Sequence, residues 1–327
     1  MSFPWPKLNV RRDPLLLLTI LLVTVLSPIG IQDSMAQSYT SADLMDVKVA
    51  VYSDRGTLED STAALNAMFG WMNANVSYVN STEIKNGILD EYDILAVPGG
   101  STGSYAIYLG VEGMEAIRQF VANGGSYFGI CGGSLLGTRG RIGLFNGSYV
   151  SENPGYSIGT YLTEMTVNHN STGPELSDLP ANYTTMFWNS AYFDSDDMSE
   201  IITVMSYPRN GLPAMIAFKY EYGTVFLSSP HPEYEEGDAR DGTDNWDELD
   251  DPDSEWDLML RVSRWLVDES LIVPTTTTTT TISIPTSPTD GGTVDNNTEL
   301  SIPDPGVTVA VVSVGIVLVV AVIVRRR

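Results

Sequence analysis

The chain has one cysteine, Cys131, and its neighbours indicate that the thiol is reactive. It lies in the sequence Gly-Ile-Cys-Gly-Gly at residues 129–133, directly after an apolar run that predicts a strand. Glycines on both sides of a nucleophile are typical of a sharp turn from strand to helix, where a Cβ would clash. The helix N-terminus that follows favours the thiolate over the thiol. A buried structural cysteine in a glycine-rich turn is the alternative.

A histidine that could act as a base toward this thiol follows a later predicted strand. His231 lies in the sequence Ser-Ser-Pro-His-Pro-Glu at residues 228–233. Residues two apart in an extended segment point to the same side, so Glu233 can brace His231 and fix its tautomer. This order predicts a catalytic triad of Cys131, His231 and Glu233. A turn with an exposed histidine is the alternative, and His169, in a loop-like stretch, is the weaker candidate for the base.

Backbone N–H groups near the thiol could stabilise the negative charge that develops on a carbonyl oxygen under attack. A Pro-Gly-Gly turn at residues 98–100 ends another predicted strand. The N–H groups of Gly100 and Gly132 are therefore predicted to form an oxyanion hole. Gly99 and Ser134 are expected to contact the substrate. This chemistry requires no metal ion and no cofactor, and none is predicted.

Alternating strands and helices must position these residues. Predicted strands cover residues 47–52, 75–79, 92–97, 125–130, 161–167, 201–205, 214–218 and 223–227. Predicted helices cover residues 57–71, where Thr57 and Asp60 offer a capping box, 111–122 and 255–266. This alternation predicts an α/β domain with a mostly parallel sheet and helices on both faces. Ligands of such sheets bind beyond the carboxyl ends of the strands, where Cys131 and His231 lie.

The two ends of the chain predict export. Basic residues near the N-terminus precede an apolar run at 15–26, and small residues at 34 and 36 suit cleavage, so residues 1–36 are predicted to be a signal peptide. An uncleaved signal anchor is the alternative. Near the other end, residues 307–324 form an apolar run followed by three arginines at 325–327. This pattern predicts one transmembrane helix with a cytoplasmic basic tail.

Between these segments the composition changes once more. Residues 274–306 are rich in Thr, Ser and Pro and predict a disordered stalk, which leaves residues 43–273 as one folded domain. The expected location is the cell membrane, with a single membrane pass and the folded domain extracellular.

The charge of the chain excludes one class of partner. The formal net charge of -24 would repel nucleic acid and anionic lipid headgroups. Acidic residues are densest at 235–257. A solvated loop is the simpler interpretation of that segment, and a weak calcium site is the alternative.

With these residues in place, the chain resembles the class I glutamine amidotransferase-like superfamily, most closely its biotin-protein ligase N-terminal-like branch. The resemblance spans residues 47–267, and the matching stretches are residues 51–53, 92–100, 117–131 and 229–233. It implies a flavodoxin-like, doubly wound sheet with a nucleophile elbow and a Cys131, His231, Glu233 triad. Glutamine-hydrolysing members usually carry a glutamine four residues after the nucleophile, whereas this chain has Leu135.

Three functions from different classes fit the sequence. The first is a cysteine hydrolase that acts on an amide or γ-glutamyl-type bond of a small molecule or peptide. The second is a non-catalytic, ligand-binding surface module that retains the amidotransferase-like fold, and a purely structural surface protein is a third. The chain contains no synthetase domain to receive ammonia and no biotin-ligase half, so neither ammonia transfer to a synthetase partner nor biotin transfer is implied.

Overall fold

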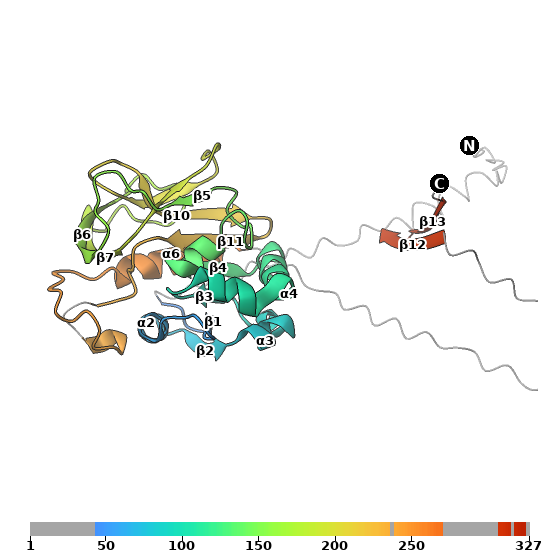
Figure 1. The fold of residues 1–327 in the computed structure, drawn as a ribbon, viewed down its shortest axis with the longest axis horizontal. Helices are drawn as coiled ribbons and strands as arrows, with labels where there is room; N and C mark the ends of the chain where they lie inside the picture. The colour runs from blue at the N-terminus through green and yellow to red at the C-terminus, as the bar shows by residue number, and fades with distance from the viewer. Residues whose placement is uncertain (1–42, 236–238, 271–306, 315–316, 325–327) are drawn as a thin grey trace, which may run out of the picture. The chain divides into compact units, whose positions relative to one another are not determined.

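The computed structural model describes residues 43–235, 239–270, 307–314 and 317–324 (Figure 1). The chain divides into two units, Met1–Thr275 and Thr276–Arg327. The first unit contains the predicted α/β domain. The predicted signal peptide, stalk and basic tail lie outside the described residues.

A nine-stranded sheet forms the centre of the first unit, with the order β2-β1-β3-β4-β11-β10-β9-β6-β7. Its strands are β1 (Lys48–Tyr52), β2 (Asn75–Val79), β3 (Ile94–Val97), β4 (Ser126–Ile130), β6 (Thr160–Val167), β7 (Asn182–Trp188), β9 (Ile202–Ser206), β10 (Pro213–Tyr220) and β11 (Gly223–Ser228). Two short strands, β5 (Ser148–Val150) and β8 (Tyr192–Asp194), pair separately.

The sheet is mixed, which corrects the prediction of a mostly parallel one. Strands β2, β1, β3, β4 and β11 pair in parallel, in the 2-1-3-4-5 order of doubly wound folds. From β11 outward, the pairs with β10, β9, β6 and β7 are antiparallel. For β10 and β11 the physical reason is the length of the connection. Only two residues separate β10 from β11, whereas a parallel crossover needs a dozen or more.

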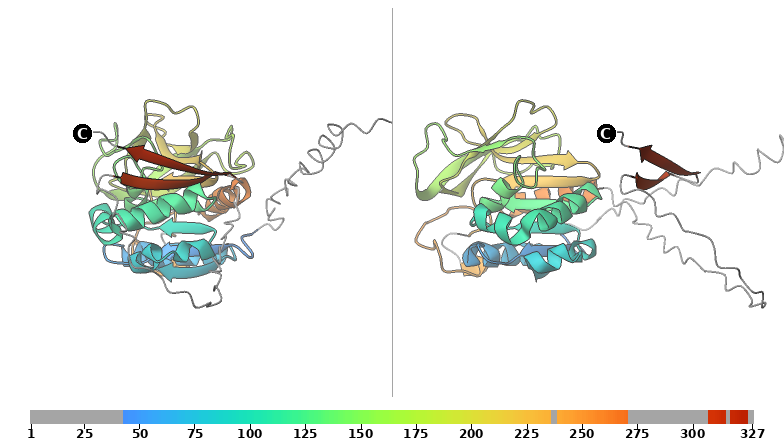
Figure 2. Two further views of the ribbon diagram at one scale, coloured as in Figure 1. Left: turned by 90° about the vertical axis from the view of Figure 1, so that its right-hand side faces the viewer. Right: turned by 45° about the vertical axis from the view of Figure 1, so that its right-hand side comes forward.

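Helices cover both faces of the parallel strands (Figures 1 and 2). The helices are α2 (Glu59–Trp71), α3 (Ser81–Lys85), α4 (Thr102–Ala122), α5 (Gly132–Leu136) and α6 (Trp256–Glu269), with single 3-10 turns η1 (Ile88–Glu91) and η2 (Ala239–Asp241). Helices α2 and α6 share one apolar core with the sheet, and α4 and α5 share the other. Strands β3, β4 and β11 are buried along their whole length, as parallel strands covered on both faces must be.

Two helix predictions need correction in detail. Helix α2 has no side-chain cap, because the Thr57 hydroxyl donates to the Asp54 carbonyl oxygen at 2.8 Å instead of capping the helix. Helix α4 begins nine residues before the predicted start at Val111 and is kinked at Gly110, where φ is 61°. Both changes lie at the helix starts, and neither moves a strand.

The second unit differs from its prediction. The transmembrane helix expected over residues 307–324 is not seen, because the described residues there form two antiparallel strands, β12 (Val307–Val314) and β13 (Val317–Val324). Valine and isoleucine dominate this stretch, and β-branched side chains favour the extended conformation. Across the described ranges, no helix is both long and apolar enough to cross a membrane.

Candidate active site

Cys131 lies in a strained turn between β4 and α5. Its φ is 48° and its ψ is -107°, a conformation that costs energy for any residue with a Cβ. The turn is held to the neighbouring strand, since the Cys131 N–H donates to the Ser228 carbonyl oxygen at 2.8 Å. The glycines let other segments approach: a Cβ on Gly132 would lie 2.1 Å from the Gly100 carbonyl oxygen. The predicted nucleophile elbow is therefore present as backbone geometry.

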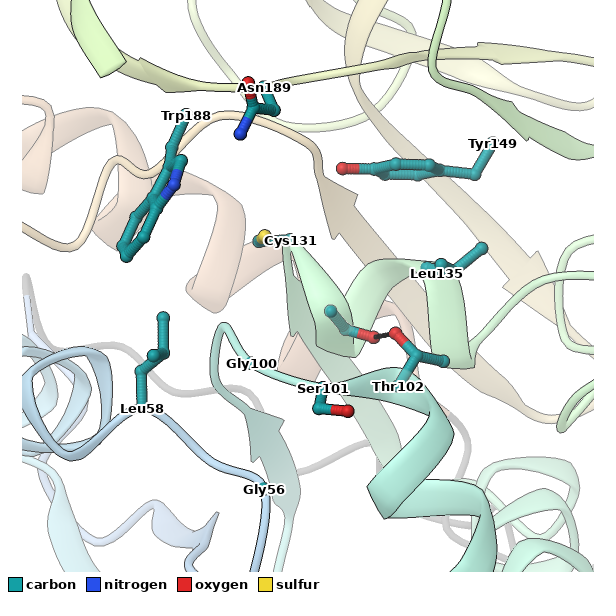
Figure 3. Close-up of a pocket in the computed structure, with 11 residues that line it drawn as sticks. Gly56, Leu58, Gly100, Ser101, Thr102, Cys131, Leu135, Tyr149, Trp188 and Asn189 are labelled. Carbon is teal, nitrogen blue, oxygen red and sulfur yellow. Dashed lines mark hydrogen bonds between the residues drawn. The ribbon is translucent and has the colours of Figure 1, made fainter. Parts of the chain in front are cut away.

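Hydroxyl groups fasten the carbonyl groups of this turn. Thr102 Oγ1 donates to the Gly132 carbonyl oxygen at 2.8 Å, as Figure 3 shows. Ser134 Oγ donates to the carbonyl oxygens of Cys131, at 2.9 Å, and Ser228, at 2.8 Å, and the residue is fully buried. This placement corrects the expectation that Ser134 contacts the substrate, because its hydroxyl hydrogen bonds lie within the protein.

His231 and Glu233 form a buried pair after β11. The His231 Nδ1 lies 2.8 Å from the Glu233 Oε1, and both side chains are fully buried. Burial lowers the pKa of His231, but the charges of Glu233 and of the Cys131 thiolate raise it, and the net pKa is well above its usual value. With Nδ1 paired to Glu233, Nε2 is the ring atom that remains for chemistry, and hydrogen bonding to the Cys131 side chain is a further cause of the raised His231 pKa.

Ser61, which the sequence did not indicate, connects this pair to the Pro-Gly-Gly turn. Its hydroxyl donates to the Glu233 Oε1 at 2.7 Å and accepts from the Gly99 N–H at 2.9 Å. The Gly99 N–H is thus already bonded within the protein, and the predicted substrate contact of Gly99 stays a prediction. The close packing of this region is visible at Gly99, where a Cβ would lie 2.8 Å from the His231 ring.

Gly100 and Gly132 meet beside Cys131. Gly100 has a φ of 147°, and a Cβ there would lie 2.3 Å from the Gly56 carbonyl oxygen, so only glycine fits. Within the described residues, the N–H groups of Gly100 and Gly132 donate to no backbone acceptor. The predicted oxyanion donors are therefore adjacent and unoccupied by backbone partners.

A pocket of about 500 Å³ opens over Cys131 (Figure 3). It is lined by Gly56, Leu58, Gly100, Ser101, Thr102, Cys131, Gly132, Leu135, Tyr149, Trp188 and Asn189. The elbow and the Gly100 turn form one side in Figure 3, and Tyr149, Trp188 and Asn189 stand across the pocket from them. Trp188 also packs on the His231 ring, with the ring centroids 5.5 Å apart, and helps to keep the imidazole from solvent.

The wall residues Tyr149, Trp188 and Asn189 were missed by sequence reasoning. Trp188 ends a strand, β7, that was not predicted, Asn189 follows it directly, and Tyr149 lies in the three-residue strand β5. One signal was available for β7, because its sequence is rich in Tyr, Thr, Phe and Trp, which favour strands. Nothing local indicated that these side chains would face Cys131.

The remaining candidates do not join the site. His169 is exposed, and its ring nitrogen lies 3.2 Å from the Pro180 carbonyl oxygen. In the acidic segment, carboxylates bond to nearby groups: Asp253 accepts from the Thr184 N–H, and Glu235 pairs with Arg240 at 2.7 Å. Among the residues that the structure describes, no group of three or more His, Cys, Asp or Glu side chains could hold a metal ion. Among the described residues of this segment, the calcium interpretation therefore finds no ligand set.

Comparison with known families agrees with the resemblance seen in the sequence. Residues 47–149 match the family model described as "Biotin-protein ligase, N terminal". The predicted resemblance to that branch is thus confirmed over this span. The span contains Gly100, Cys131 and Gly132, and it ends at Tyr149, before His231 and Glu233.

The chain is also similar to individual proteins. An "Uncharacterized protein" of Chlamydia muridarum is 29% identical over 217 residues, which are 57% of this chain and 80% of that protein. The phosphoribosylformylglycinamidine synthase subunit PurQ of Staphylococcus saprophyticus is 26% identical over 168 residues, 46% of this chain and 74% of that subunit. A glutamine amidotransferase structure from Thermotoga maritima has 16% identity and a TM-score of 0.41, and the alignment covers 67% of this chain and 90% of that one. The similarity to PurQ supports a glutamine amidotransferase-like α/β domain.

Proposed function

We propose that this domain is a cysteine hydrolase that cleaves an amide or γ-glutamyl-type bond with Cys131, His231 and Glu233. One observation carries the proposal: a cysteine in a strained turn interacts with the histidine of a buried His–Glu pair and lies with two glycines whose N–H groups have no backbone acceptor among the described residues. Nucleophile, base, orienting carboxylate and oxyanion donors are the four parts that acyl transfer needs.

The reaction proceeds in two steps. In the first, the Cys131 sulfur attacks the carbonyl carbon, and the N–H groups of Gly100 and Gly132 stabilise the oxyanion. His231 gives its Nε2 proton to the leaving nitrogen, the C–N bond breaks, and a thioester forms. In the second, His231 takes a proton from water, the resulting hydroxide attacks the thioester, and the acid is released with the free thiolate. Glu233 holds the imidazole in place throughout.

The PurQ similarity supports cleavage of an amide bond, whereas Leu135 argues against a glutamine-binding site like that of glutamine-hydrolysing members of the superfamily. Leu135 lines the pocket at the position where glutamine-hydrolysing members of the superfamily usually carry a glutamine. This apolar substitution is the observation that favours the second candidate, a module that binds a ligand without cleaving it.

A hydrolysis screen with a matched pair of variants separates the two candidates. The full chain in mild detergent is incubated with small amides, γ-glutamyl compounds and blocked peptides, and released amine or ammonia is measured. We expect turnover that falls at least 10³-fold in both Cys131→Ala and Cys131→Ser, together with a hydroxylamine-trapped acyl group in the wild type only. Turnover that survives in both variants would contradict the hydrolase. Binding without turnover would favour the binding module.

We also propose that the domain works outside the cell and is held at the membrane by the apolar stretch at residues 307–324. The proposal rests on the signal-like N-terminus, the Thr-rich segment and the three terminal arginines. Protease added to intact cells should remove the domain while a cytoplasmic marker stays whole. Recovery of uncut protein from intact cells, but not from lysed ones, would place the domain inside.

A further inference from the structure

The pocket wall opposite Cys131 carries two hydrogen-bond donors, and Tyr149 is the first. Ser229 Oγ donates to the Tyr149 hydroxyl oxygen at 2.9 Å and accepts from the Ala191 N–H at 2.6 Å. Burial and the charge of the Cys131 thiolate raise the pKa of Tyr149 well above its usual value, so the phenol keeps its proton. Since its oxygen already accepts from Ser229, the Tyr149 O–H is left to donate into the pocket.

Asn189 is the second donor. Its Oδ1 accepts from the Gly159 N–H at 2.8 Å, which fixes the orientation of the side-chain amide. The Nδ2 group consequently points the other way, toward the space above Cys131 in Figure 3. The backbone of Asn189 has a φ of 48°, and the pairing of its N–H with the Gly159 carbonyl oxygen at 2.9 Å holds this uncommon conformation.

The rest of the pocket offers no ionic partner. Among the described residues that line it, none is an Asp, Glu, Lys, Arg or His, and Leu58, Leu135 and Trp188 contribute apolar surface. An ammonium or carboxylate group that enters such a site loses hydration without gaining a counter-charge. The chain's net charge of -24 further disfavours an anionic ligand. A free amino acid carries both kinds of charge close to its reacting end.

We propose that the substrate is an uncharged carboxamide whose amino and carboxyl ends are both blocked, as in a glutamine within a peptide, and not a free amino acid. Tyr149 and Asn189 donate to carbonyl oxygens of the blocked ends, and the apolar side chains contact the aliphatic part. This inference rests on the proposed hydrolase, and it names the substrate class of the same site. A wall with neutral donors and no charge selects acceptor-rich neutral groups.

Two probes with the same reacting carboxamide test the inference. Nα-acetyl-L-glutamine N-methylamide and free L-glutamine are titrated into the full-length Cys131→Ala chain in detergent, and the dissociation constants are measured by calorimetry. We expect the blocked compound to bind at least tenfold more tightly. Tyr149→Phe should weaken its binding about fivefold, which is the effect of one neutral hydrogen bond, and Asn189→Asp, which replaces a donor by a charged acceptor, should weaken it at least as much. Tyr222→Phe, a change at an exposed tyrosine in the β10–β11 turn, should leave it unchanged.

The outcomes separate this inference from the proposed function. Equal or tighter binding of free glutamine, or no binding of the blocked compound, overturns the inference. Unchanged binding in both Tyr149→Phe and Asn189→Asp overturns the assignment of the donors. Selective binding of the blocked compound that the wild-type chain never hydrolyses supports the ligand class and contradicts the hydrolase.

Discussion

The two halves of the sheet contribute different things to the pocket. The parallel half, from β2 to β11, supplies Cys131, the two glycine N–H groups and the His231–Glu233 pair from turns at its carboxyl ends. The antiparallel half and the β5–β8 pair supply Trp188, Asn189 and Tyr149 from strands and strand ends. Reactive groups in the first half depend on backbone geometry, whereas contacts in the second depend on side chains.

This difference indicates how well each half of the sheet should tolerate amino-acid substitutions. Gly99, Gly100 and Gly132 in the parallel half have no room for a Cβ, and the carboxylate and imidazole of that half are buried with each other as principal partners. The wall residues are half-buried or exposed. Substitutions in the first half should therefore cost stability and reactivity together, while substitutions in the second should change ligand binding alone.

The largest effect is expected from removing the buried carboxylate. Glu233→Ala leaves the buried His231 without its partner and should lower the free energy of unfolding by about 4 kcal/mol. Glu164→Ala, at an exposed position of β6 in the antiparallel half, should change it by less than about 0.5 kcal/mol. Denaturant unfolding measures both. Similar losses in the two variants would remove the proposed contrast between the halves.

Two glycines of the parallel half, one in the turn at Cys131 and one in helix α2, test whether the reactivity of that half depends on the tight turn. Gly132→Ala would place a Cβ 2.1 Å from the Gly100 carbonyl oxygen, and it should destabilise the chain by about 3 kcal/mol and slow alkylation of Cys131 by iodoacetamide. Gly70→Ala has open space in helix α2 and should instead stabilise by about 0.5 to 1 kcal/mol. Thermal unfolding and alkylation rates provide the two readouts. A Gly132→Ala chain that alkylates at the wild-type rate would mean that the tight turn is not needed for reactivity.

Replacing Ser61 should cost less stability than the changes above, but it should also have a specific effect on the reactivity of Cys131. Ser61→Ala leaves the buried Gly99 N–H without an acceptor and should cost about 2 kcal/mol. Because the same hydroxyl donates to Glu233, the variant should also change the pH profile of Cys131 alkylation. Ser61→Thr keeps the hydroxyl and should restore that profile. An unaltered profile in Ser61→Ala would reduce Ser61 to a packing role.

The ionisation of His231 can be followed directly by NMR of nitrogen-labelled imidazole. Its pKa is raised, so the contribution of His231 to stability is fully present below the unfolded pKa, about 6.5, and is lost as pH rises through the folded value. Each pH unit of that shift corresponds to about 1.4 kcal/mol. Glu233→Gln should lower the titration midpoint more than Cys131→Ala does, since the carboxylate is the stronger cause of the raised pKa. The reverse order would make the thiolate the main partner.

Local sequence predicted the reactive half because its signals are local. The glycines around Cys131 and the spacing of His231 and Glu233 each lie within six residues. The missed contacts are distant in the chain: Ser61 and Glu233 are 172 positions apart, and Tyr149 and Ser229 are 80 apart. The periodicity of hydrophobic residues along the chain gives no information about contacts between such distant residues. At residues 307–324, hydrophobicity alone predicted a helix, although the β-branched composition favoured strands.

The smallest expected effect comes from Leu135, which belongs to the parallel half but faces the wall. If the parallel half decided recognition, Leu135→Gln would restore the side chain that glutamine-hydrolysing members usually carry, and free glutamine would become a good substrate. We expect a change below about twofold in kcat/KM for free glutamine, because one neutral amide supplies no counter-charge for its ammonium and carboxylate groups. The half-buried position should keep the stability change within about 1 kcal/mol. A tenfold or larger gain, measured by ammonia release, would mean that the elbow helix determines substrate recognition and that the antiparallel wall does not.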